Sequence, residues 1–297
     1  MKKLFFIISA TFLPFSSHAW EPCGIDAYGH TANCEYQIDA SGTLTIRGVG
    51  NNGNIGHWYS NEQSDFVQPW KGKNVKNIVI EDSIKDLGGQ AFYNIKSENP
   101  IKIPSSVTSV SAYAFDGVET PEVIIPDSVE IIGDSSFKSE SLQKITIPDS
   151  VKIIEGSAFR WSTNLTDIVF PENLESIGDL ALSYCLNLKT ITIGENTNLG
   201  ALFEGYDYDQ DATDIANLKI YCTGDTAKCD AHLAAAGYPD LKSSKATTKQ
   251  INGVTYVYDK SGKLVTSSGH RTEKRIYTIE EANAIAGTKN RISIKYR

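Results

Sequence analysis

The middle of the chain repeats itself with a period of 22–23 residues, and this repeat limits the possible folds more than any other feature. Prolines recur at Pro104, Pro126, Pro148 and Pro171, and a bulky apolar residue recurs at Phe92, Phe115, Phe137, Phe159 and Leu182. The repeated blocks are NIVIEDSIKDLGGQAF (77–92), PIKIPSSVTSVSAYAF (100–115), EVIIPDSVEIIGDSSF (122–137), KITIPDSVKIIEGSAF (144–159) and DIVFPENLESIGDLAL (167–182). A sixth block begins at residue 190 and then degrades. A fixed period of this length predicts a solenoid, in which each unit buries its apolar face by stacking on its neighbours.

Each block is expected to form one coil of that solenoid. In the fourth block, Ile145 and Ile147 should point inward from a short strand. The chain should then turn at Pro148-Asp149-Ser150, because proline cannot donate a ladder hydrogen bond and Asp and Ser favour turns. Val151 and Ile154 point inward after the turn. The strands of successive coils should pair as a parallel sheet along one face of the array.

The pattern I-x-I-P-x-x-V-x-x-I-x-x-x-A-F resembles the BspA-like leucine-rich repeat family, over about residues 75–200. Members of that family are secreted or surface-exposed proteins, several of them adhesins that bind host matrix proteins. The resemblance therefore implies a leucine-rich-repeat solenoid that binds an extracellular protein or glycan, and it names no ligand. The sequence departs from the family pattern at Ser136, which replaces the small Ala of the A-F pair, and at Leu182, which replaces the Phe.

The amino-terminal segment predicts export. Lys2 and Lys3 form a basic start, Leu4 to Phe15 is an apolar run, and Ser17-His18-Ala19 offers the small residues that signal peptidase recognises. We expect residues 1–19 to be a signal peptide that is cleaved near Ala19. The mature chain should then be secreted, periplasmic or held at the cell surface, and we expect no transmembrane segment in it.

Five cysteines fit an oxidising compartment. Cys23 and Cys34 form one closely spaced pair and Cys222 and Cys229 another, so we expect two local disulfides. Zinc binding by these pairs is the alternative, although no CxxC spacing occurs. Cys185 is left over and is expected to be a small buried apolar residue.

These patterns predict four parts of the chain: a signal peptide (1–19), an amino-terminal β-cap (20–73), the repeats (74–240) and a tail (241–297). The cap should hold a hairpin that turns at Asp39–Gly42, between strands at residues 35–38 and 43–46. The repeats should end in an irregular last coil with an inserted loop around 205–211 and a short helix at 230–237. The tail should be a linker (241–250), a hairpin (255–266), a second linker (267–274) and a small β-α-β unit (275–297).

Charge is distributed unevenly between these parts. Residues 20–240 hold 14 Lys and Arg against 32 Asp and Glu, whereas residues 241–297 hold 12 against 4. An acidic body predicts no nucleic-acid partner. The basic tail should contact something anionic, such as lipid head groups, a wall polymer or the acidic solenoid itself.

Motifs for catalysis are weak. Gly48-Val-Gly50-Asn-Asn-Gly53 matches G-x-G-x-x-G but leads into no helix, so no phosphate cradle is expected. A Cys34 pair with His30 or His57 would lose its thiol to the disulfide with Cys23. The alternating aspartates at 207–211 lack the glycine and closing glutamate of a calcium loop. We expect no enzymatic activity, no cofactor and no metal. The alternative is a secreted hydrolase with its site in the irregular coil and tail.

The binding face is predicted from strand alternation, because side chains along a strand point to opposite faces. The residue between the two inward positions of each strand should point outward, and these residues form the predicted binding column: Val79, Lys102, Ile124, Thr146, Val169, Thr192 and Lys219. A second outward column would be Asn77, Pro100, Glu122, Lys144, Asp167, Thr190 and Asn217. The binding column is mildly apolar, which favours a contact strip; β-propensity at exposed sites is the alternative explanation.

Overall fold

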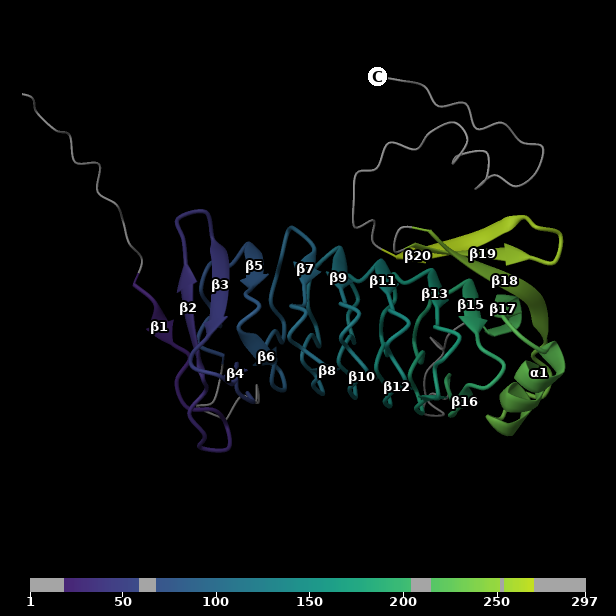
Figure 1. The fold of residues 1–297 in the computed structure, drawn as a ribbon, viewed down its shortest axis with the longest axis horizontal. Coiled ribbons are helices and arrows are strands. Elements are labelled where there is room, and N and C mark those ends of the chain that lie inside the picture. The colour runs from purple at the N-terminus through teal and green to yellow at the C-terminus, as the bar shows by residue number, and fades with distance from the viewer. Residues whose placement is uncertain (1–18, 59–67, 204–214, 252–253, 270–297) are drawn as a thin grey trace, which may run out of the picture.

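The computed structural model describes residues 19–58, 68–203, 215–251 and 254–269 (Figure 1). The segment predicted to be a signal peptide (to residue 18), the predicted loop at 205–211 and the predicted β-α-β unit at 275–297 lie outside the described residues. Within the described part, coils stack side by side along the long axis, with an amino-terminal sheet at one end and a helix at the other (Figure 1).

The first strand of each coil contributes to one face of the array, which we call the first-strand face. Its strands are β5 (Asn77–Ile80), β7 (Ile101–Lys102), β9 (Glu122–Ile124), β11 (Lys144–Thr146), β13 (Asp167–Val169), β15 (Thr190–Ile193) and β17 (Lys219–Cys222). Where neighbouring members of this series are paired, they pair in parallel. Parallel pairing therefore follows the expectation from the repeat.

A second series of short strands, which the repeat pattern did not predict, lies on the opposite side of the coils (Figure 1). Its members are β6 (Ile84–Asp86), β8 (Ser109–Val110), β10 (Ile131–Ile132), β12 (Ile153–Ile154), β14 (Ser176–Ile177) and β16 (Asn198–Leu199). β8 to β16 form one parallel sheet in chain order. The sequence placed Ile154 inward, as observed, but a strand of two residues is too short to give an alternating pattern.

The proline column makes the turn between the two strands. The backbone N–H of the residue three positions after each proline donates to the proline carbonyl, at 3.1 Å in the coils of Pro104, Pro126, Pro148 and Pro171. Serine hydroxyls then join neighbouring coils: Ser128 Oγ donates to the Val107 carbonyl at 2.6 Å and Ser150 Oγ to the Val129 carbonyl at 2.7 Å. The predicted turn at Pro148-Asp149-Ser150 is confirmed.

The aromatic column forms the core. Phe92, Phe115, Phe137 and Phe159 are fully buried, as is Leu182. Consecutive phenylalanine rings stack with centroids 5.0, 5.5 and 5.9 Å apart and planes within 10°. The ring of Trp70 continues this stack beyond Phe92, at 6.1 Å. Stacked aromatic rings add to the stabilisation that burial alone provides.

The coil closes through left-handed backbone at positions that, apart from Gly117, hold no glycine. The residue two before the core aromatic position has a positive φ in every coil: Gln90, Tyr113, Ser135, Ser157 and Leu180, with φ of 51–60°. The residue two after it is also left-handed at Asn94, Gly117, Trp161 and Tyr184. Non-glycine residues rarely adopt this conformation, so the repeat tolerates local strain at the first place in all five of these coils and at the second place in three of them.

Ser136 is a buried departure from the family pattern with a measurable consequence. Its side chain is fully buried, and among the described residues its hydroxyl has no hydrogen-bond partner. We expect Ser136→Ala to raise the free energy of unfolding by about 1–3 kcal/mol, because a buried unpaired hydroxyl costs about that much. Ser139 is the matched control, since it is equally buried but donates to the Val118 carbonyl at 2.5 Å. Ser139→Ala should lower stability in urea unfolding; a loss of stability in both variants would contradict the account.

The amino-terminal sheet joins the array at β5. It contains β1 (Glu21–Pro22), β2 (Cys34–Ile38) and β3 (Thr43–Gly48), and β3 pairs with β5 in parallel. The predicted hairpin turn is present, with Gly42 at φ 85°. The disulfide Cys23–Cys34 ties the start of this sheet, as expected. A further short strand, β4 (Gly53–Asn54), pairs with β6 of the first coil.

The other end of the array carries the 3₁₀ helix η1 (Ile215–Asn217), β17 and the helix α1 (Thr226–Ala235). The helix starts earlier than the predicted residue 230, because Asp225 accepts a hydrogen bond from the Ala227 N–H and caps it. The disulfide Cys222–Cys229 links β17 to α1, as expected. Cys185 is buried, and its burial raises the pKa of the thiol to about 12.

The segment expected to be a linker at 241–250 is instead a strand, β18 (Ser243–Ile251), which pairs in parallel with β17. Residues of high loop propensity became a strand here because β17 offers an edge to pair with. β19 (Val254–Asp259) and β20 (Leu264–Gly269) pair as an antiparallel hairpin, and β20 extends into the expected second linker. No helix of the described residues is long and apolar enough to cross a membrane.

Candidate binding surface

The predicted binding column is open to solvent at the amino-terminal half of the first-strand face. Val79 is 46% exposed, although Ile78 and Ile80 on either side of it are buried. Lys102 is exposed and Ile124 is half-buried, with β7 and β9 in register as Lys102↔Ile124. Thr146, opposite Ile124 on β11, is half-buried and marks the border of this region. We call Val79, Lys102 and Ile124 the open strip.

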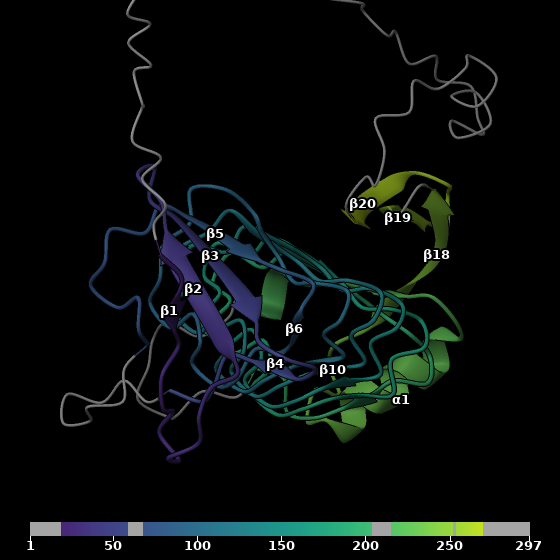
Figure 2. The same cartoon turned by 60° about the vertical axis from the view of Figure 1, so that its left-hand side comes forward.

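Val169 and Thr192 are not exposed, which corrects the expectation for the carboxy-terminal half of the column. They are 5% and 0% exposed. The reason is that β18, β19 and β20 fold back over the first-strand face, where Val169 packs against Ala246 and Val257 (Figures 1 and 2). Sequence alternation along one strand says nothing about a distant segment that covers it.

The position of Lys219 is also corrected. Lys219 pairs with Thr190, and Tyr221 is the residue opposite Thr192. Asn217, expected in the second column, lies in η1. The predicted pairing of β17 is shifted by two residues from the observed one. Such a shift leaves every side chain on the same face of the strand, so the apolar pattern fits either register. Lys219 is exposed, but it belongs to the second column.

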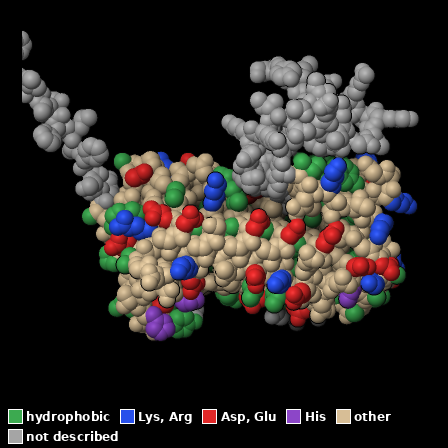
Figure 3. Space-filling model, viewed as in Figure 1, with side chains coloured by type: hydrophobic (Ala, Val, Ile, Leu, Met, Phe, Trp, Pro, Cys, Tyr) green, Lys and Arg blue, Asp and Glu red, His purple; other side chains and the backbone are tan. Residues whose placement is uncertain are grey.

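A ladder of carboxylates runs along the first-strand face, at the residues after Pro126, Pro148 and Pro171 and at the equivalent residue after Gly194: Asp127, Asp149, Glu172 and Glu195. Burial, together with the neighbouring carboxylates of Glu172 and Asp127, raises the pKa of Asp149 above its ordinary value. Acidic side chains form rows along the face of the array in Figure 3. The sheet β18–β20 uses this ladder: Thr248 Oγ1 donates to Glu172, and Gln250 Nε2 donates to Asp149. A small cavity of about 160 Å³ remains beneath these contacts.

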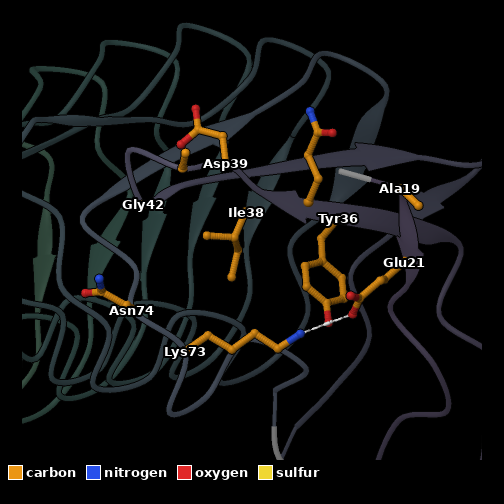
Figure 4. Close-up of a pocket in the computed structure, with 10 residues that line it drawn as sticks. Ala19, Glu21, Tyr36, Ile38, Asp39, Gly42, Lys73 and Asn74 are labelled. Carbon is orange, nitrogen blue, oxygen red and sulfur yellow. Dashed lines mark hydrogen bonds and ion pairs between the residues drawn. The ribbon is translucent and has the colours of Figure 1, made fainter. Parts of the chain in front are cut away.

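The amino-terminal sheet holds a pocket of about 410 Å³ (Figure 4). Within it Lys73 Nζ donates to Tyr36 Oη, and Tyr36 Oη donates to Glu21. Lys73 also lies 4.6 Å from the centroid of the Tyr36 ring. These polar groups satisfy one another and tie β1 to the loop before the first coil, so the geometry fits a structural role.

The weak catalytic motifs have structural explanations. A Cβ added at Gly48 or Gly53 would lie 2.3 or 2.1 Å from the Ser83 carbonyl oxygen, so close packing requires these glycines. Cys34 is disulfide-bonded to Cys23. Among the described residues, no group of three His, Cys, Asp or Glu could hold a metal ion. The site of the alternative hydrolase was expected in the irregular coil and tail, of which residues 204–214 and 270–297 lie outside the described residues.

Comparison with protein families agrees with the coil geometry. The model of the BspA type leucine-rich repeat region matches six copies, at residues 69–145 and 86–203. The repeat array is a BspA-type leucine-rich repeat region. The stacked coils, parallel strands and buried aromatic column described above are thus those of BspA-type repeats, and the fold is a leucine-rich-repeat fold with mostly parallel strands and few helices.

Several solved bacterial structures resemble the BspA-type array. A leucine-rich repeat protein of T. pallidum is 21% identical, with a TM-score of 0.28, and the match covers 56% of this chain and 61% of that one. A leucine-rich repeat protein from Eubacterium ventriosum is 17% identical, with a TM-score of 0.40, covering 69% and 68%. The pneumococcal vaccine antigen PcpA is 12% identical, with a TM-score of 0.38, covering 74% and 98%. No curated protein sequence matches the chain.

Proposed function

We propose that this chain is an exported, adhesin-like protein that binds an extracellular protein or glycan through the open strip on its first-strand face. Support comes from the BspA-type repeats and from the two disulfides, which suit an oxidising compartment. The proposal includes removal of residues 1–19 on export. It also assigns the amino-terminal sheet and α1 the role of caps that cover the two ends of a solenoid.

The exposure of Val79 is the observation that carries the proposal. An aliphatic side chain that is 46% exposed lies between two buried isoleucines, on a strand at the start of the array. Lys102 and Ile124 continue the strip on the next two strands. The strip therefore places an ammonium group between two aliphatic side chains. Extended faces of stacked repeats suit a partner that spans several coils.

We expect the double variant Val79→Asp/Ile124→Asp to abolish partner binding with little change in melting temperature. The two introduced carboxylates would lose their hydration when the partner covers them, whereas in the free protein they would stay in contact with water. The measurement is biolayer interferometry of the full chain against purified extracellular matrix proteins and immobilised glycans. Ile153→Asp is the matched control, because Ile153 is 36% exposed on β12 in the opposite sheet. Equal binding by the parent and the double variant would place the contact elsewhere.

The basic tail has two roles in this proposal. Residues 243–269 contact the acidic array itself, through Thr248 and Gln250. Residues 270–297 hold seven Lys or Arg against three acidic residues, and we assign them to an anionic envelope surface.

A further inference from the structure

A trench crosses the turns that follow the aromatic column, on a surface separate from the open strip. Its volume is about 820 Å³, and it extends from Tyr93 in the first coil to Trp161 in the fourth. The position two after the core aromatic residue explains its shape. That position holds Asn94, then the small residues Gly117 and Ser139, then the large Trp161. The trench is therefore a gap in a repeating column, closed at one end by an indole ring.

The floor of the trench is held by hydrogen bonds between coils. The Asn94 N–H donates to the Asp116 carbonyl at 3.0 Å, and the Gly117 N–H donates to the Lys138 carbonyl at 2.7 Å. A Cβ at Gly117 would lie 1.8 Å from Asn94 Oδ1, so a larger residue there would displace the Asn94 side chain. Such a floor is fixed before any ligand arrives, which lowers the entropic cost of binding.

Trp161 presents one ring face to the trench. Its other face stacks on Tyr184 in the next coil, with centroids 4.2 Å apart and planes at 4°. Since this stack runs along the array, the free face points back toward the preceding coil, where Ser139 occupies the equivalent position. The side chain is only half-buried and lines the trench. Trp161 is thus a rigid, flat apolar platform at the end of a polar groove.

The polar lining offers both donors and acceptors. Asp116, Glu119 and Glu140 provide carboxylates, and Lys138 provides an ammonium group 3.7 Å from Asp116. Asp116 is 8% exposed, so its carboxylate is held largely out of water. Three carboxylates against one ammonium disfavour an anionic ligand. A cationic ligand would meet Lys138 in the middle of the trench.

We propose that this trench binds a neutral oligosaccharide, with one pyranose ring stacked on Trp161 and its hydroxyls bonded to Asp116, Lys138 and Glu140. The C–H face of a pyranose packs on an aromatic ring, and sugar hydroxyls require acceptors and donors side by side. Adjacent coils repeat at about 4.8 Å. That spacing is close to the length of one sugar unit in a β-linked chain, so successive units would meet successive coils. The site uses none of the residues of the open strip.

The test uses the full chain and titration calorimetry with cellohexaose, xylohexaose, chitohexaose and mannohexaose, and with hexa-arginine. We expect at least one neutral hexasaccharide to bind. Trp161→Asn should weaken that binding by about tenfold or more, and Glu140→Gln should weaken it as well. Asn is chosen because it tolerates the left-handed backbone of Trp161, at φ 62°. Tyr113→Asn is the matched control: Tyr113 is 41% exposed, at φ 59°, and does not line the trench.

Two results would overturn the proposal. One is that no neutral hexasaccharide binds, or that binding is unaffected by both Trp161→Asn and Glu140→Gln. The other is that hexa-arginine alone binds and is lost in Glu140→Gln, which would make the trench a site for cationic peptides. Glu140 is exposed, so Glu140→Gln should leave the fold unchanged. It therefore tests the trench even if Trp161→Asn lowers the melting temperature. The strip variant Val79→Asp/Ile124→Asp should bind the hexasaccharide normally, so failure of one site is distinguishable from failure of the other.

Discussion

Phe137→Ala is expected to lower the free energy of unfolding by about 3–5 kcal/mol, the usual cost of truncating a buried aromatic side chain. Phe137 is fully buried, and its ring stacks between Phe115 at 5.5 Å and Phe159 at 5.9 Å. Truncation therefore leaves a cavity in the middle of the aromatic column and removes two ring contacts. Neighbouring coils on both sides lose part of the interface that stabilises them.

Urea unfolding followed by circular dichroism measures this effect. Tyr113→Ala is the control, because it removes an aromatic ring that is 41% exposed two residues before the core position of the preceding coil. A smaller change is expected there. An unfolding midpoint for Phe137→Ala that equals the parent value would show that the column is not the core of the repeat.

Val257→Asp is expected to detach the sheet β18–β20 from the first-strand face while the repeat array stays folded. Val257 is fully buried against Val169 and Ala246 in a cluster separate from the main core. Burial of a valine contributes about 1.5–3 kcal/mol, whereas an unpaired buried carboxylate costs several kcal/mol. The few apolar contacts of this cluster cannot offset that cost, so the hairpin should separate from the first-strand face while the rest of the protein stays folded.

Maleimide labelling of Thr192→Cys reports the opening, because Thr192 is fully buried in the covered region. Labelling should be slow in the single variant and faster by more than about tenfold when Val257→Asp is added. Thr247→Asp is the matched control, since it places the same charge on an exposed position of β18. Rapid labelling of Thr192→Cys with Val257 intact would mean that the hairpin does not cover this face.

The repeat, its turns and its core were predictable because each rests on a local rule that recurs. Proline fixes the turn in coil after coil. The phenylalanine column was expected inside, because a large apolar side chain recurs there at one position of the block. Both disulfides followed from short separations along the chain. Val79 was correctly placed outward by strand alternation alone.

The covered half of the face could not be predicted, because it depends on a contact between segments far apart in sequence. Thr248 donates to Glu172, 76 residues earlier, and Gln250 donates to Asp149, 101 residues earlier. Nothing in the local sequence of either residue indicates a strand. The left-handed residues also gave no signal, because Tyr113, Ser157 and Leu180 replace the glycine that usually marks such backbone. The trench was missed because it arises from small residues in a column whose conformation the sequence did not reveal.

Hydroxyl-radical footprinting of the full chain, alone and bound to a partner found in the matrix and glycan screen, tests the central claim most directly. The open strip should bind, so oxidation of Val79 and Ile124 should fall on binding, while oxidation of Ile153 on the opposite sheet should not change. Protection of Ile153, with Val79 and Ile124 still oxidised at the rate of the free protein, would contradict the assignment of the first-strand face as the binding surface.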